Sequence, residues 1–190
     1  EDRMKKKPIL KKQMNRKYYY LFGLSVMLML LAFVIESPQS LVSGMMTILV
    51  SPSQLFTDYM QIASVGSTLL NVAIMLGISI YSYKKLEFPL NGTVIGSLGM
   101  LAGFSFFGKN LFNSIPFMIG VWIYTKVTKQ NYRNYVIVGL FGSALGPLIS
   151  FLAFSGVLPQ GWSVLIAYAL GIFIGFILPQ LSTQFLGFHQ

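Results

Sequence analysis

The sequence of 190 residues has no cysteine, one histidine and five acidic residues. The missing cysteines exclude disulfide bonds, thiolate nucleophiles, zinc–cysteine sites and iron–sulfur clusters. The few acids leave little material for acid–base catalysis or for a metal site. The sequence also lacks the motifs G-x-x-x-x-G-K-[ST], H-E-x-x-H, G-x-G-x-x-G and G-x-S-x-G. We therefore expect no enzyme, no bound metal and no cofactor.

Charge is scarce and apolar residues are abundant. Charged residues make up 10% of the chain and hydrophobic residues 54%, with a mean hydropathy of +0.66. Ordinary soluble domains carry about 25% charged residues. A soluble chain of this length has too small a core for so much apolar surface, and a disordered chain does not tolerate it. The composition predicts an all-α integral membrane protein.

Long apolar segments give the expected organisation, since a helix needs about 20 mostly apolar residues to cross a bilayer. Six spanning helices are predicted near residues 18–35, 62–82, 91–108, 111–125, 135–154 and 162–178. The apolar segment 40–50 is too short to cross and is predicted to be a re-entrant or interfacial helix. Residues 18–190 are expected to form a single transmembrane domain, which follows a basic tail over residues 1–17. The natural chain is expected to begin at Met4, with residues 1–3 an addition.

The basic residues predict the orientation in the membrane. The 14 Lys and Arg residues exceed the five acids, which gives a net charge of +9. Eight lie before the first apolar segment, and two further clusters are Lys84 with Lys85, and Lys126 with Lys129 and Arg133. With a cytoplasmic N-terminus, all of these lie on the inner side, as the positive-inside rule requires. We therefore expect a multi-pass protein of the inner (plasma) membrane, whose tail contacts anionic lipid. No nucleic-acid partner is expected.

Polar residues inside the second apolar segment share one helical face. They are Ser64, Ser67, Thr68 and Asn71, spaced at i, i+3, i+4 and i+7. One interpretation is hydrogen bonding between helices, worth about 0.6 kcal/mol per bond. The other is that Ser64, Ser67 and Asn71 line a path for a solute.

Glycines recur in the third and sixth segments. The pairs are Gly92 with Gly96, Gly99 with Gly103, and Gly171 with Gly175. This spacing is typical of closely packed membrane helices. Asn91 is a predicted N-cap. Alternatively, the helix that begins at Asn91, Gly92 and Thr93 presents its N-terminus to a substrate or ion, as discontinuous helices of transporters do.

The richest segment is residues 103–116, at the junction of two short helices. Lys109 is the one cation predicted on the outer side. It is expected either to reach water as an ordinary loop lysine or, with Asn110 and Asn113, to face an anionic or amide-like solute. In the second case, Phe104, Phe106 and Phe107 form a constriction. Two further features are Pro116, with Asn113 or Ser114 as its expected helix cap, and the pair Gly146 and Pro147, which predicts a kink.

Within this segment, Phe107-Gly-Lys-Asn-Leu-Phe-Asn-Ser-Ile-Pro116 resembles an uncharacterised family of bacterial polytopic membrane proteins, one of the groups with a domain of unknown function. The stretches 51–59, 89–92 and 142–148 support this resemblance, which covers roughly residues 40–190. Members of the family are about twice as long and continue past a segment like Gly187-Phe-His189. The resemblance implies an N-terminal portion and no known activity.

A weaker likeness is to urea transporters, through Asn91-Gly92-Thr93 and the short helix before it. It implies one half of an inverted-repeat transporter. We expect a transporter or channel subunit for a small polar or anionic solute, acting as a homo-oligomer or with a second half-transporter chain. The alternative is a non-transporting scaffold or assembly subunit that binds partner membrane proteins. A lipid-modifying enzyme using Ser105 and Lys109 is the remaining enzymatic alternative.

Overall fold

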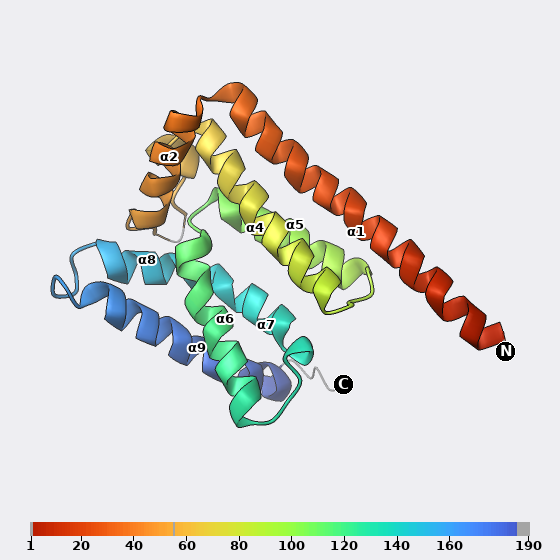
Figure 1. Cartoon of the computed structure of the whole chain (residues 1–190). Coiled ribbons are helices and arrows are strands. Elements are labelled where there is room, and N and C mark those ends of the chain that lie inside the picture. The colour runs from red at the N-terminus through yellow and green to blue at the C-terminus, as the bar shows by residue number, and fades with distance from the viewer. Residues whose placement is uncertain (1, 55, 186–190) are drawn as a thin grey trace.

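The computed structural model describes residues 2–54 and 56–185 of the chain, and the side chains of residues 16–54 and 56–182. The described part is helical, with one isolated β-bridge between Asp58 and Phe107 (Figure 1). The helices are α1 (Asp2–Ile35), α2 (Pro38–Val50), α3 (Tyr59–Ile62), α4 (Val65–Lys85), α5 (Gly92–Phe106), α6 (Leu111–Val127), α7 (Val136–Gly142), α8 (Gly146–Phe154) and α9 (Ser163–Phe185), with short 3₁₀ helices η1 (Tyr132–Asn134) and η2 (Ser143–Leu145). The predicted all-α fold is therefore correct for the described residues, whereas the segment Gly187–His189 lies outside them.

Four helical stretches of the described chain are long and apolar enough to cross a bilayer. They are Arg16–Ile35, Val65–Lys85, Val136–Phe154 and Ser163–Ser182. The helices α5 and α6, for which the sequence also predicts crossings, have 15 and 17 residues and are not among these four. At 1.5 Å per residue they are about 22 and 26 Å long, against the roughly 30 Å of a hydrocarbon core. A turn over residues 107–110 joins the two short helices, which do not pack along each other, and this pair is called the α5–α6 hairpin below.

The helix α2 has 13 residues, about 20 Å, and is also too short to cross. Its start follows from local sequence: Ser37 accepts a hydrogen bond from the Ser40 N–H, and Pro38 occupies the first turn, where a missing N–H costs nothing. The sequence prediction of a short, non-spanning helix at residues 40–50 agrees with this length.

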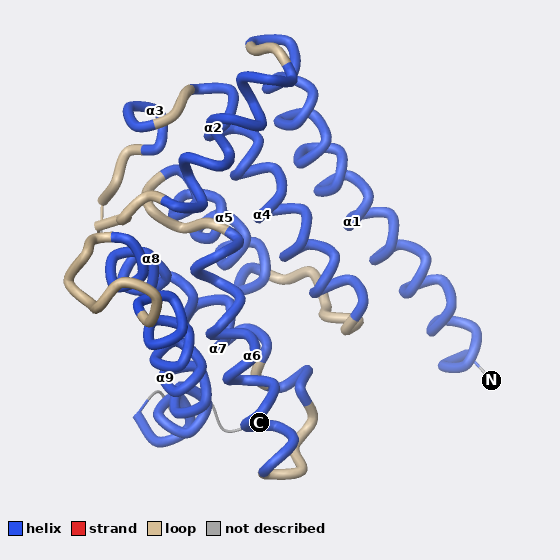
Figure 2. The backbone as a smooth tube through the Cα atoms, turned by 60° about the vertical axis from the view of Figure 1, so that its left-hand side comes forward, coloured by secondary structure: helices blue, strands red, loops and turns tan. Residues whose placement is uncertain are grey.

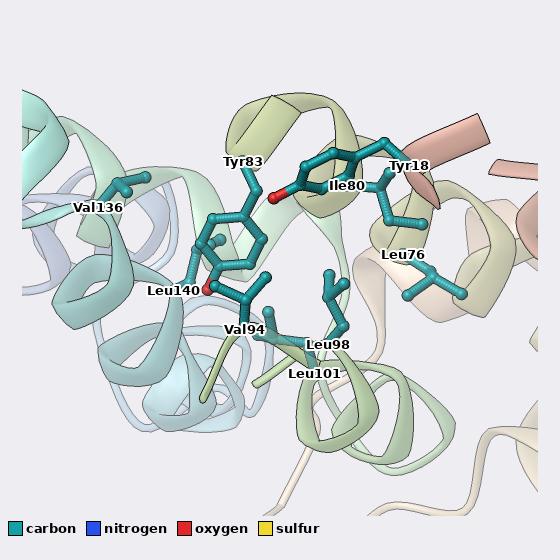
Figure 3. Close-up of a cluster of buried hydrophobic side chains, with 9 residues drawn as sticks. All are labelled: Tyr18, Leu76, Ile80, Tyr83, Val94, Leu98, Leu101, Val136 and Leu140. Atoms are coloured by element: carbon teal, nitrogen blue, oxygen red, sulfur yellow. The ribbon is translucent and has the colours of Figure 1, made fainter. Parts of the chain in front are cut away.

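One apolar core lies between α1, α4, α5 and α7. Figure 3 shows its side chains converging from these helices. Its members are Tyr18, Leu76, Ile80, Tyr83, Val94, Leu98, Leu101, Val136 and Leu140. The helices α1 and α4 approach closely because Gly77 leaves room for the Ser25 hydroxyl, which donates to the Ala73 carbonyl at 2.7 Å.

A second apolar core joins α6, α8 and α9. It contains Phe117, Ile149, Ala153 and Ala167. Gly120 of α6 and Gly171 and Gly175 of α9 lie against the facing helix, where an added Cβ would collide with its backbone or with Pro116. The predicted close packing at Gly171 and Gly175 is therefore present.

Two connections with basic residues lie away from the α1–α2 connection, on a side of the molecule that is called the lower end below. In Figure 2 the α4–α5 and α6–α7 connections lie below the α1–α2 connection, which is at the top. The lower end carries Lys84 and Lys85 in the last turn of α4 and Lys126 in the last turn of α6. The Lys84 Nζ lies 4.0 Å from the centre of the Tyr19 ring, and the Arg133 guanidinium 5.4 Å from that of Phe88. Cations and aromatic rings therefore gather at this end.

Candidate functional site

The connection between α5 and α6 is the point where the described helices converge. Gly108 has φ +87°, a conformation that residues with a Cβ rarely adopt. An added Cβ would also lie 3.0 Å from Pro147 Cγ and 3.1 Å from the Gln54 carbonyl oxygen. The tight turn at Gly108 therefore ends the α5 segment and brings Lys109 against α7 and α8.

Asn110 fixes the start of α6. Its side-chain oxygen accepts from the Asn113 N–H and the Asn113 side-chain oxygen accepts from the Asn110 N–H, both at 3.0 Å. This reciprocal pair is a capping box. The Asn110 side-chain NH₂ donates to the Ile48 carbonyl and to the Tyr59 hydroxyl, each at 2.9 Å. Burial raises the pKa of Tyr59 to about 12, so this hydroxyl stays neutral at pH 7. Asn110 thereby ties α6 to α2 and α3.

Asn113 and Asn71 make equivalent ties to other helices. The Asn113 NH₂ donates to the Gly108 carbonyl at 2.7 Å and to the Ser150 hydroxyl of α8 at 2.9 Å. The Asn71 NH₂ of α4 donates to the Ser105 carbonyl at 2.8 Å and the Lys109 carbonyl at 2.9 Å. All three asparagines are buried and bind protein groups. They hold the junction together and leave no free amide for a solute.

Lys109 is the one buried cation among the described side chains, with 1% of its surface exposed. Its Nζ donates to the Ser143 hydroxyl of η2, which in turn donates to the Leu140 carbonyl. An ammonium has three donors, and no carboxylate of the described residues pairs with it. Glu36 and Asp58 cap helices elsewhere in the fold. Burying a charge without a partner of opposite charge costs free energy. Such a lysine is therefore a candidate for binding an anionic ligand.

A groove of about 450 Å³ extends from Lys109 between α4 and α6. The two helices do not pack closely against each other, and α7 lies behind the gap. The α4 wall has Met75, Ile78, Ser79 and Ser82, and the α6 wall has Leu111, Ser114, Ile115, Met118, Ile119 and Trp122. Lys109 and Ser143 form one end, and Ser82, Trp122 and Tyr132 lie toward the other, the end that carries the basic connections.

The groove forms beside a break in the helix predicted over residues 135–154. This segment is present as α7, the 3₁₀ turn η2 and α8. The break immediately precedes Gly146 and Pro147, where the sequence predicts a kink. Asn113 occupies the space beside Gly146. A Cβ added at Gly146 would lie 2.8 Å from the Asn113 Cγ atom, so only glycine fits here without a shift. The break places Ser143 within reach of Lys109.

The structure separates the predicted pathway residues. Ser64 caps α4 and donates to the Glu36 carboxylate at 2.8 Å, and Ser67 contacts α2 through the Leu41 carbonyl. With Asn71, they make hydrogen bonds between segments and lie outside the groove. The Ser64 hydroxyl, together with the Gly66 N–H and Ser40, holds the pKa of the Glu36 carboxyl below its ordinary value, against the opposing effect of burial.

Other predicted residues also lie outside the groove. Asn91 caps α5 and, like Thr93, is exposed at the opposite end of that helix from Lys109. Phe107 is 46% exposed, Phe106 is half-buried, and neither lines the groove. An added Cβ at Gly92, Gly96, Gly99 or Gly103 would meet open space, so these glycines have no close neighbour in the described chain. Pro116 lies inside α6, whose cap is Asn110 rather than Asn113 or Ser114.

The groove contains residues that the sequence did not indicate. Ser79, Ser114 and Ser143 border it, and each hydroxyl donates to a carbonyl of its own segment. Each hydroxyl oxygen can still accept a hydrogen bond. No sequence motif identifies these serines as groove residues. Among the described residues, no group of three His, Cys, Asp or Glu side chains could hold a metal ion.

Comparison with known proteins identifies a family without assigning a function. No curated protein and no solved structure matches the chain. The likeness to urea transporters therefore stays a prediction. Residues 37–190 match the family model described as "Protein of unknown function (DUF1576)", which confirms the resemblance expected over residues 40–190. The chain therefore belongs to the DUF1576 family.

Proposed function

We propose that this chain is a multi-pass membrane protein that transports a small polar or anionic solute, and that the groove between α4 and α6 is its binding site. The observation that carries the proposal is Lys109. It is buried, has no carboxylate partner among the described residues and lines one end of a groove of about 450 Å³. A cation in such a place costs free energy unless a ligand of opposite charge visits it.

The helices around Lys109 support transport. The short helices α5 and α6 meet at the lysine, and the α7–α8 segment is broken beside it. Short or interrupted helices that meet inside the bilayer are a recurring feature of transporter binding sites. The helix breaks supply turns of backbone where local movement is less costly than in a continuous helix.

The proposed orientation has the N-terminus in the cytoplasm of the cell and the inner (plasma) membrane as location. In this orientation α5 begins and α6 ends on the cytoplasmic side. The later segments therefore keep the same orientation whether α5 and α6 each cross the membrane or enter and leave it on that side. Lys84, Lys85, Lys126 and Arg133 then all face the cytoplasm, in agreement with the positive-inside rule.

The direct test is uptake of labelled anions and neutral polar solutes into liposomes that contain the full protein. Lys109→Met is expected to reduce uptake at least tenfold, since it removes the only charge at the groove. Lys85→Met is the matched control, because Lys85 is exposed in the last turn of α4, does not border the groove and contacts the Tyr81 ring rather than a groove residue. Equal uptake by both variants and the native protein would contradict a role for the groove.

A second candidate function is a scaffold that holds a partner membrane protein. It is favoured by the glycine face of α5, since an added Cβ at Gly96, Gly99 or Gly103 meets open space. Glycine faces let helices from different chains approach closely. Absence of uptake for every solute, with a protein that co-purifies in fixed ratio and is lost in Gly99→Leu, would favour this function over transport.

A further inference from the structure

The groove has an apolar body and one charged end. Of its 14 lining residues, eight are aliphatic, Met or Trp, four are Ser, one is Tyr and one is Lys. Its lining contains no Asp or Glu. The serine hydroxyls already donate to backbone carbonyls, so Lys109 is the one side chain with unused charged donors.

This division argues against a small hydrated ion as the ligand. An inorganic anion loses many hydrogen bonds to water when it enters the groove. The apolar walls replace none of these bonds; their side chains include Met75, Ile78, Ile115 and Met118. A neutral polar solute meets the same walls and leaves the charge of Lys109 uncompensated. Neither kind of solute fits both parts of the groove.

An organic anion with an apolar portion fits both. Its charged oxygens would accept from Lys109 Nζ and its carbon skeleton would lie between Ile78 of α4 and Ile115 of α6. Binding sites of this size are commonly apolar, with a few polar groups that fix the orientation of the ligand. We propose that the groove binds a small amphiphilic monocarboxylate, with the carboxylate at Lys109 and Ser143 and the apolar chain directed toward Trp122. This inference rests on the proposed function and narrows its solute.

Binding is measured on the full protein in nanodiscs of zwitterionic lipid, with radiolabelled hexanoate as the probe. Unlabelled acetate, which has the carboxylate without the chain, and 1-hexanol, which has the chain without the charge, compete with it. Both are expected to compete at least tenfold less well than hexanoate. Lys109→Met is expected to weaken hexanoate binding at least tenfold, whereas Lys85→Met is expected to leave it unchanged and corrects for partition into the lipid.

A second variant tests the apolar part of the site without touching the charge. Ile115 is 38% exposed on the groove wall, so a larger side chain there is tolerated by the fold. Ile115→Trp is expected to weaken hexanoate binding at least fivefold and to leave competition by acetate unchanged. Unchanged hexanoate binding in this variant would overturn the placement of the chain.

The outcomes separate the inference from the proposed function. Acetate or hexanol competing as well as hexanoate, or no hexanoate binding at all, overturns the inference, and Lys109-dependent uptake of a small polar solute would then leave transport standing. Hexanoate binding that depends on Lys109 without any uptake supports the inference and contradicts transport. Hexanoate binding that is unaffected by Lys109→Met in a folded variant overturns the assignment of the carboxylate.

Discussion

The Tyr168 hydroxyl of α9 donates a hydrogen bond of 2.8 Å to the Phe112 carbonyl of α6. This carbonyl lies four residues before Pro116, the position whose N–H would bond to it in a regular helix. Proline has no N–H, so the carbonyl would be left without a partner inside the protein. The two helices pack closely here, with Gly171 against the Pro116 ring. Tyr168 therefore replaces the donor that proline removes.

Tyr168→Phe is expected to lower the free energy of unfolding by about 1–2 kcal/mol, since the Phe112 carbonyl loses its donor while the ring remains. The measurement is denaturant unfolding of the purified protein in detergent. Pro116→Ala restores an N–H to the helix and supplies the background for a double-mutant cycle.

In the Pro116→Ala background, Tyr168→Phe is expected to cost less than half as much, because the alanine N–H can occupy the carbonyl. Equal costs in the two backgrounds would show that the contribution of the Tyr168 hydroxyl does not depend on the N–H that Pro116 lacks.

Lys109→Met is expected to raise stability while it reduces uptake. The substitution removes a buried charge that no carboxylate of the described residues pairs with, at a gain of about 1–3 kcal/mol. For a chain of this size each kcal/mol corresponds to a rise of about 2–4 °C in the melting temperature. Thermal unfolding in detergent measures this rise, and Lys126→Met should leave the melting temperature unchanged. A fall for Lys109→Met would mean that Lys109 is a structural residue.

The elements that follow from local composition were predictable from the sequence. Four long apolar stretches, the short helix at Pro38–Val50 and the kink near Pro147 each depend on residues adjacent in the chain. The bounds of α5 and α6 were predicted to within two residues, but the tight turn between them was not, because hydropathy continues through Phe104, Phe106 and Phe107 while the backbone turns at Gly108. Hydropathy averages do not detect a turn that is fixed by contacts with Pro147 and Gln54.

The candidate site was predictable only in part, for the same reason. Lys109 was identifiable as an unusual cation in an apolar segment. Its partner Ser143 lies 34 residues further along the chain, and no periodic pattern connects them. The sequence analysis grouped Asn110 and Asn113 with Lys109, and the structure shows them side by side. Their reciprocal capping hydrogen bonds, however, do not follow from the sequence alone, since the same residues can also stand in other backbone conformations. Tertiary contacts therefore decided which polar residues border the groove.

Gly108→Ala is expected to destabilise the protein by about 1–3 kcal/mol, because its φ of +87° is strained for alanine and Pro147 is too close for a Cβ. Gly99→Ala is the matched control. Gly99 lies in α5 with open space around its Cβ position, and alanine favours a helix by up to about 1 kcal/mol. Denaturant unfolding of both variants measures the difference. Equal effects would contradict the tight turn at Gly108.

Acid is expected to destabilise the upper end of the molecule through Glu36. Its carboxylate accepts from the Ser64 hydroxyl and from the Gly66 N–H in the first turn of α4, and the Ser64 bond lowers its pKa. A pKa that is lower in the folded state stabilises above the unfolded value of about 4.3, and this contribution is lost as the pH falls through the folded-state pKa. Glu36→Gln should lower the melting temperature at pH 7 and flatten its decline below about pH 4. A parallel decline in both proteins would exclude Glu36 as the cause.

The absence of cysteine makes the orientation of the chain directly measurable, since single introduced cysteines have no competing thiol. Pro89→Cys and Gln130→Cys occupy exposed positions in the α4–α5 and α6–α7 connections, and Val157→Cys an exposed position between α8 and α9. In sealed vesicles, a charged thiol reagent is expected to label Pro89→Cys and Gln130→Cys from the cytoplasmic face and Val157→Cys from the other. In the proposed orientation one crossing separates Gln130 from Val157, because the α7–α8 segment is long and apolar enough to cross the bilayer once. Labelling of Pro89→Cys and Gln130→Cys from opposite faces would mean that the α5–α6 hairpin crosses the membrane, and the groove beside Lys109 would then need a different entrance.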